Sequence, residues 1–119
     1  MEFLTRDQIL NADDLPYRDE AVPEWGGTVR ISTITAADRD TFESMIFDTV
    51  DGKPVFKRDN FRAKLLAMCL VDANGKRLFS EGDIEILGRK SAKAVQRLFD
   101  IAQELNGTSE AAKEAIEKK

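Results

Sequence analysis

The stretch FRAKLLAMCLV, residues 61–71, decides the fold. After Lys64 it is apolar around nearly the whole circumference of a helix, and a helix of that kind is normally central and buried. Asp59 or Asn60 precedes it and supplies a side chain suited to a helix cap. The sequence therefore predicts a central helix over 61–71. Cys69, the single cysteine, lies in this run, so we expect a buried, unreactive thiol.

The residues after this run predict a turn, a short helix and a long helix. Residues 72–75 have turn composition, and 78–79 return the chain to the core. Residues 80–88 contain a capped start and a glycine stop, typical of a short helix. The last helix begins after Ser91 and ends at 106–107. Its apolar stripe repeats at three and four residues and consists of Val95, Leu98, Phe99, Ala102 and Leu105.

The residues before the central run predict two further helices. Thr5 and Gln8 have the spacing of a capping box, so a helix of one or two turns should follow and end near residue 11. The linker closed by Pro16 indicates irregular structure over 12–20. Another helix should begin after Thr35 and stop before the Asp-Gly pair at 51–52. An extended piece is expected at 55–56. The apolar stripe of this helix is Phe42, Met45 and Ile46.

A β-hairpin is predicted over about 21–32. Apolar residues alternate on both sides of the pair Gly26-Gly27, and two glycines supply the positive φ angles of a tight turn. Pro23 has no amide proton to donate to a ladder, which places the first strand at an edge. An isolated hairpin is marginal, so helices should cover one face.

Length and composition favour one domain. The chain has 119 residues, of which 42% are hydrophobic and 34% charged, a balance typical of a folded domain. We expect a mainly α fold with a small β-hairpin (α+β), in which four to six helices form a compact helical domain over 1–107. Residues 108–119 contain one large apolar side chain and predict a charged tail or a solvated helix.

The charge distribution weighs against nucleic acid as the main partner. Residues 1–30 hold seven acids and three bases, so the net charge of −4 lies entirely in this first quarter, and phosphates would repel it. The alternative is a small nucleic-acid-binding regulator that uses the basic segment 53–64, in which Phe56 and Phe61 lie among lysines and arginines. Solvated surface charge is the simpler interpretation of that segment.

The residue inventory excludes common catalytic chemistry. The chain has no histidine and one cysteine, so it lacks the commonest general base near neutral pH and the four ligands of a structural zinc site. We expect no enzyme, no cofactor and no metal, although a pair of carboxylates leaves a small enzyme as a third alternative. The amino terminus lacks a secretory signal and no stretch has the length of a membrane span, so we expect a cytoplasmic protein.

Nine stretches, taken in order, resemble the tail assembly chaperones of long-tailed bacteriophages and prophages. The resemblance covers residues 4 to about 105. The stretches are LTRDQIL (4–10), ADDLP (12–16), VPEWGG (22–27), DRD with FE (38–43), RAKLLA (62–67), LVD (70–72), RLF (77–79), LG (87–88) and KSA (90–92).

The resemblance implies a protein of the host cell cytoplasm that binds the tape measure protein, which is long, helical and aggregation-prone. It would keep this client soluble during tail assembly and be absent from the finished virion. The resemblance also implies a homo-oligomer and, in many relatives, a longer frameshifted form whose extra domain recruits tail tube protein. It implies no catalytic residue.

Two sets of residues are candidates for protein binding. Trp25, Val29 and Ile31 are predicted to form a hairpin surface between copies, because an edge strand accepts another strand. For Trp25 a role as a lid on the core is the alternative. Asp13 and Asp14, in the acidic N-terminal segment, would steer basic stretches of a client or of a neighbouring copy.

Overall fold

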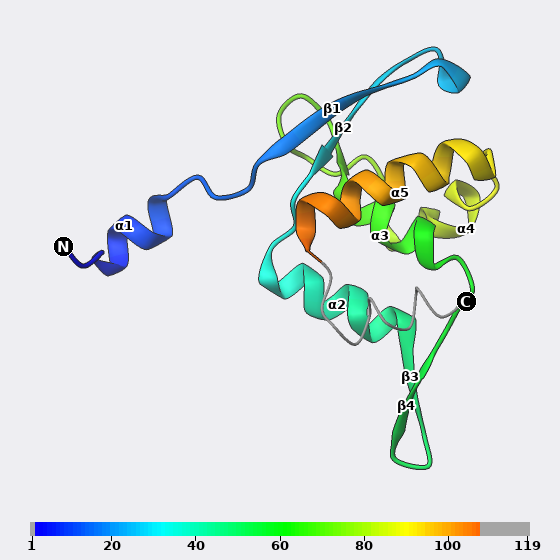
Figure 1. Cartoon of the computed structure of the whole chain (residues 1–119), viewed down its shortest axis with the longest axis horizontal. Helices are drawn as coiled ribbons and strands as arrows, with labels where there is room; N and C mark the ends of the chain where they lie inside the picture. The colour runs from blue at the N-terminus through cyan, green and yellow to red at the C-terminus, as the bar shows by residue number, and fades with distance from the viewer. Residues whose placement is uncertain (1, 108–119) are drawn as a thin grey trace.

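The computed structural model describes residues 2–107, and the predicted tail or helix at 108–119 lies outside these described residues. Figure 1 shows a body of helices and strands from which the N-terminal segment and one hairpin project in different directions. The radius of gyration is 15.7 Å, whereas a compact chain of this length would have about 13 Å. The excess agrees with the two projections.

The centre of the body is α3 (Phe61–Cys69), as the sequence predicts. Every residue of α3 except Arg62 is buried. This helix packs against α5 (Ala92–Asn106) and α2 (Ala36–Ile46), and Figure 1 shows it enclosed between them. The apolar stripes of both neighbours face it, because their predicted stripe residues are buried or packed on the core cluster.

Local capping chemistry defines the helix ends where the sequence predicts them. The hydroxyl of Thr35 accepts a hydrogen bond from the N–H of Asp38 at the start of α2. The hydroxyl of Ser91 does the same for α5, which ends at Gly107 in the left-handed region. The short helix α4 (Ile84–Leu87) follows a 3₁₀ turn and ends at Gly88. These boundaries confirm the predicted caps of α2, α4 and α5. At the start of α3, Asn60 occupies the cap position but makes no side-chain cap hydrogen bond, so the capping side chain predicted there is wrong.

A three-stranded antiparallel sheet covers the body and extends past the predicted hairpin. Its strands are β1 (Tyr17–Val22), β2 (Gly27–Ser32) and β5 (Leu70–Val71), in the order β1-β2-β5. Two predictions are wrong here. Residues 17–20 form a strand rather than irregular structure, and the central helix ends at Cys69 because the next two residues pair with β2. The first strand lies at an edge, as predicted, while Pro23 belongs to the turn.

A second hairpin replaces the predicted loop between α2 and α3. It consists of β3 (Phe47–Val50) and β4 (Lys53–Phe56). Asp51 and Gly52 connect them with φ angles of 52° and 76°, the conformation of a two-residue hairpin turn that favours Asp-Gly. The expected extended piece at 55–56 is therefore the end of a full strand.

The described residues form five α-helices and two small antiparallel sheets, which confirms the α+β class. All buried hydrophobic residues among 2–107 except Val71 belong to one cluster. Phe79 packs against that cluster, whereas Leu78 is exposed. Across residues 2–107, none of the helices is long and apolar enough to cross a membrane. A single domain ending at residue 107 stays a prediction.

Candidate protein-binding surfaces

The N-terminal arm, residues 2–16, projects from the body and exposes apolar side chains (Figure 1). Its helix α1 (Arg6–Asn11) buries no residue. The N–H of Gln8 donates to the Thr5 hydroxyl at 3.2 Å, and the N–H of Thr5 donates to Gln8 Oε1 at 2.9 Å, which is the predicted capping box. The exposed apolar residues of the arm are Phe3, Leu4, Ile9, Leu10 and Leu15.

The arm leaves the body next to the C-terminal end of α5. The carbonyl of Pro16 accepts hydrogen bonds from the N–H and the hydroxyl of Thr33 at 3.0 and 2.6 Å. The neighbouring N–H of Ile34 donates to Asn106 Oδ1 at 2.8 Å. Arg39 donates to the carbonyls of Asn106 and Gly107. These contacts fix the position from which the arm extends.

The two predicted aspartates lie exposed on the arm, between α1 and β1. Asp13 lies beside a hollow that Tyr17 and Arg30 also line, and Asp14 lies beside a second hollow lined by Arg39. Both carboxylates are therefore available to a partner. They lie at the root of the arm, away from the hairpin turn that carries Trp25.

The predicted hairpin residues face the core rather than solvent. Ile31 is 0% exposed, so its side chain belongs to the core and cannot contact a second copy directly. Val29 shares its face of β2, since side chains alternate along a strand, and it packs with Trp25 against the core cluster. The alternation of apolar residues indicates one common face, but not which side of the hairpin the helices cover.

One ion pair holds this first hairpin to α5, and another joins its two strands. Glu24, in the turn, accepts from both guanidinium nitrogens of Arg97 on α5 at 2.8 and 3.0 Å. This hydrogen bonding lowers the pKa of the Glu24 carboxyl to about 2. Asp19 and Arg30 form a similar paired contact across β1 and β2 at 2.8 and 3.1 Å, which lowers the pKa of Asp19. Glu24 therefore fixes the turn of the first hairpin against α5, and a contact between copies through this hairpin stays a prediction.

The second hairpin, β3–β4, exposes two valines near its tip, on a face that Asp48 and Lys53 share. Val50 and Val55 are 52% and 45% exposed. In the observed register Val50 pairs with Lys53, and Val55 pairs with Asp48, so both valines lie on the same face of the ribbon. The Asp-Gly pair between two apolar runs signals this hairpin in the sequence, although sequence analysis interpreted it only as a helix stop.

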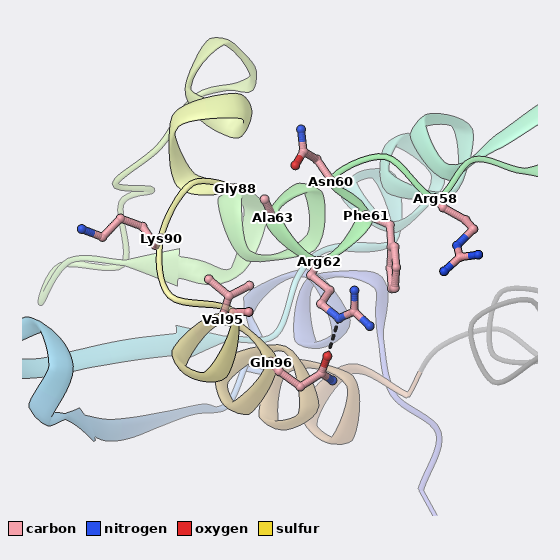
Figure 2. Close-up of a pocket in the computed structure, with 10 residues that line it drawn as sticks. Arg58, Asn60, Phe61, Arg62, Ala63, Gly88, Lys90, Val95 and Gln96 are labelled. Carbon is pink, nitrogen blue, oxygen red and sulfur yellow. Dashed lines mark hydrogen bonds between the residues drawn. The ribbon is translucent and has the colours of Figure 1, made fainter. Parts of the chain in front are cut away.

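A basic groove of about 390 Å³ lies where α3 and α5 begin and α4 ends (Figure 2). Its lining includes the cations Arg58, Arg62 and Lys90 and the buried apolar residues Phe61, Ala63 and Val95. None of the lining residues is acidic. The two arginines belong to the basic segment 53–64, whereas Lys90 is distant in sequence and lies next to them only in the fold.

Gly88 and Asn60 shape one wall of this groove. Asn60 adopts the left-handed conformation, with φ of 53°, which asparagine tolerates better than most residues. A methyl group added at Gly88 would overlap the side chain of Asn60. The end of α4 can therefore approach the start of α3 because residue 88 has no side chain.

Phe61, which lines the groove, does not offer a platform for nucleic-acid bases. Phe61 is 2% exposed, and its ring contacts Phe56 and Phe99 at centroid distances of 5.3 and 5.5 Å. The guanidinium of Arg62 lies 4.3 Å from its centroid. A ring that stacks on bases needs an exposed face. The buried ring of Phe61 therefore cannot stack on the bases of a single strand.

Two buried polar groups belong to the core. The Lys64 ammonium donates to the carbonyl of Met45 at 3.1 Å and to Asp59 at 3.5 Å. Burial raises the pKa of the Cys69 thiol to about 12, so this thiol is protonated and inert at neutral pH, as predicted. Residues 2–107 contain no group of three or more carboxylates or thiols placed to hold a metal ion.

The comparisons with known proteins point to one family. The family model described as phage tail assembly chaperone matches residues 5–119. A solved structure of the bacteriophage HK97 tail assembly chaperone has a similar fold, with a TM-score of 0.60 and 18% sequence identity over 83% of this chain and 94% of that one. No curated protein matches the sequence. Because the family model matches nearly the whole length, the chain belongs to the phage tail assembly chaperone family.

Proposed function

We propose that this protein binds the tape measure protein of a phage tail and keeps it soluble in the host cell cytoplasm until the tail is assembled. Its family supports a role in tail assembly. A long helical client with apolar surface stays soluble when a partner covers that surface. Exposed apolar side chains on a stable body would supply such cover.

The distribution of exposed apolar side chains is the observation that carries this proposal. Of the ten large hydrophobic residues exposed among residues 2–107, seven lie on the arm or on the second hairpin. Both elements project from the body (Figure 1). Scattered apolar residues on a surface are ordinary, but this concentration on projecting elements is typical of surfaces that a partner covers.

Within this proposal the second hairpin contacts the client. Its base is anchored by aromatic rings, since Phe56 contacts Phe47 and Phe61 at centroid distances of 6.0 and 5.3 Å. Its tip presents Val50 and Val55 on one face. An anchored base and an apolar tip would let the hairpin contact apolar client segments without disturbing the core.

Co-expression with the tape measure protein of the same phage tests this function. The wild-type protein should raise the soluble fraction of the client severalfold and co-purify with it. If the client stays insoluble and does not co-purify, the proposed function is wrong. This experiment also tests whether several copies bind one client, through the stoichiometry of the purified complex.

A pair of matched variants tests the role of the hairpin. Val50→Ser with Val55→Ser removes the two exposed valines and should reduce the soluble client while the melting temperature of the chaperone stays the same. Leu78→Ser is the control, because Leu78 is equally exposed at 51% and lies outside both projecting elements. Equal client solubility with both variants would show that the client binds elsewhere.

The proposal also includes a longer frameshifted form that recruits tail tube protein, as the family resemblance implies. Mass spectrometry of the proteins made during phage growth would detect the longer product. Co-purification of tail tube protein with the longer form alone would support its recruiting role.

A further inference from the structure

The arginines that line or flank the basic groove differ from the other arginines of residues 2–107. Every other arginine forms an ion pair with a carboxylate, apart from Arg39, which donates to backbone carbonyls. Arg58, Arg62 and Arg89 form no ion pair with any residue in 2–107. A guanidinium presents a planar set of donors that matches a carboxylate. These three arginines therefore keep a capacity to bind carboxylates that the described residues do not use.

The two segments that form the groove concentrate positive charge. Residues 57–62 hold three bases and one acid, and residues 88–93 hold three bases and no acid. Both segments contribute to the lining, and none of the described residues that line it is acidic. The one acid, Asp59, accepts from the Lys64 ammonium at 3.5 Å. A solvated surface normally intersperses both signs of charge, so this unbalanced charge favours an anionic partner.

Arg62 is held in position before any partner binds. Its Nε donates to Gln96 Oε1 (Figure 2), and Gln96 Nε2 in turn donates to Asp100 Oδ1 at 2.8 Å. Its guanidinium carbon lies 4.3 Å from the centroid of the Phe61 ring. Because the bond to Gln96 uses Nε, the two terminal nitrogens can still donate to a carboxylate. A cation that is already fixed loses less conformational entropy when it binds a partner.

The cations are spread along the groove rather than gathered at one point. Figure 2 shows Lys90 pointing to one side and Arg58 to the other, with Arg62 between them. Arg58 precedes α3, Arg62 lies in its first turn, and Lys90 precedes α5. A row of cations suits a segment that carries several acids along its length better than it suits one small anion.

The groove suits a protein segment better than it suits nucleic acid. The ring of Phe61 is buried and cannot stack on bases. Every residue of α3 except Arg62 is buried, so this helix has no exposed side to place in the major groove of a duplex. A duplex would therefore meet the cations through its phosphates alone, and the net charge of −4 weakens that attraction.

We propose that the basic groove binds an acidic segment of the tape measure protein, with the carboxylates of that segment on Arg58, Arg62 and Lys90. This inference rests on the proposed function, which supplies the client. It gives the chaperone two contacts of different chemistry, because the valines of the second hairpin contact apolar client surface and the groove binds acidic surface. A client helix that is apolar on one side and charged on the other offers both.

Overlapping synthetic peptides that cover the tape measure protein test this inference. Wild-type protein should bind the acidic peptides, and the binding should weaken as salt rises. Arg58→Glu with Lys90→Glu, the groove variant, should bind the tightest acidic peptide at least about tenfold more weakly by fluorescence anisotropy. Both side chains are exposed, so the melting temperature should stay the same. Arg18→Glu with Lys76→Glu reverses one exposed arginine and one exposed lysine outside the groove. This matched control should bind the peptide like the wild type.

Two further measurements separate the groove from the second hairpin. A copy of the tightest acidic peptide with asparagine for aspartate and glutamine for glutamate should lose its binding to the wild type, because it has no carboxylates. The hairpin variant, Val50→Ser with Val55→Ser, should still bind the acidic peptide like the wild type. It should lose binding to the apolar peptides, which the groove variant should keep.

Three results would overturn the inference: acidic peptides that bind no better than neutral ones, equal binding by the groove variant and its control, or loss of the acidic peptides in the hairpin variant. If a duplex DNA probe binds the wild type but not the groove variant, while acidic peptides do not bind, the groove is a nucleic-acid site and the inference is wrong. Client solubility is measured separately by co-expression. A client that is kept soluble without binding of acidic peptides contradicts this inference alone, whereas a client that stays insoluble contradicts the proposed function.

Discussion

The two hairpins have similar local structure but different relations to the body. In the first, β1–β2, Val22 and Ile31 are 0% exposed, the inner strand pairs with β5, and Glu24 in the turn binds Arg97. The second, β3–β4, packs on the core through Phe47 and Phe56 at its base and exposes valines near its tip. Figure 1 shows the first lying over α5 and the second extending away from the helices.

This difference shows that the residues of the turn determine whether a hairpin forms, whereas long-range contacts determine whether the hairpin is buried against the body or exposed. Left-handed residues at Gly26 and at Asp51-Gly52 form both turns. The first hairpin is covered by α5 and contributes to the core. The second keeps Val50 and Val55 uncovered by residues 2–107, and so has apolar side chains to offer a partner.

The largest expected difference between the two hairpins is in stability, when an apolar residue of each is replaced by aspartate. Ile31→Asp buries an unpaired charge in the core and should cost about 3–5 kcal/mol of the free energy of unfolding. Val50→Asp adds a charge at an exposed site, opposite Lys53, and should change it by less than about 0.5 kcal/mol. Urea unfolding followed by circular dichroism measures both. Similar losses in the two variants would show that the second hairpin is also part of the core.

The next largest effect is expected at Trp25, which packs on the core from the turn of the first hairpin. Trp25→Ala should cost about 2 kcal/mol of unfolding free energy, less than for a fully buried tryptophan. Its oligomer size by light scattering should match the wild type. A smaller oligomer with unchanged stability would instead make Trp25 an anchor between copies.

A smaller effect is expected in the turn of the second hairpin. Gly52 has φ of 76°, so Gly52→Ala should weaken the hairpin by about 1 kcal/mol. Faster amide exchange in β3 and β4 alone would detect this local opening. Gly27→Ala is the control, because Gly27 has open space around it and no positive φ, and it should not increase exchange. Loss of protection across the whole body would contradict a separate second hairpin.

The smallest effect is a pH dependence confined to the first hairpin. The folded pKa of Glu24, about 2, lies below its ordinary value of 4.5. Its stabilisation is therefore complete above pH 4.5 and is lost as the pH falls towards 2. Glu24→Gln should lower the melting temperature slightly at pH 6 and not at pH 2. A constant difference between the two proteins at all pH values would contradict this ion pair.

Much of the fold follows from short-range patterns in the sequence. Thr5, Thr35 and Ser91 begin helices at the predicted places, because a side-chain cap needs only the next three residues. The central position of α3 follows from its apolar circumference. These elements depend on chemistry that neighbouring residues complete by themselves.

The wrong predictions concern residues whose secondary structure depends on contacts with residues distant in the sequence. Residues 70–71 continue an apolar run and would suit a helix, but β2 recruits them as a strand. Residues 17–20 are polar or exposed because β1 is an edge strand, so they lack the usual apolar alternation. Ile31 is buried because α5 packs on the hairpin, and Lys90 lines the groove because α4 ends beside α3. Local sequence patterns do not predict where these two helices pack.

Amide hydrogen exchange of the free protein and of its complex with the tape measure protein tests the central claim most directly. The account predicts that β3 and β4 gain protection in the complex, while β1, β2 and α3 keep the protection they already have. Unchanged exchange in β3 and β4, with new protection on the first hairpin, would contradict the account.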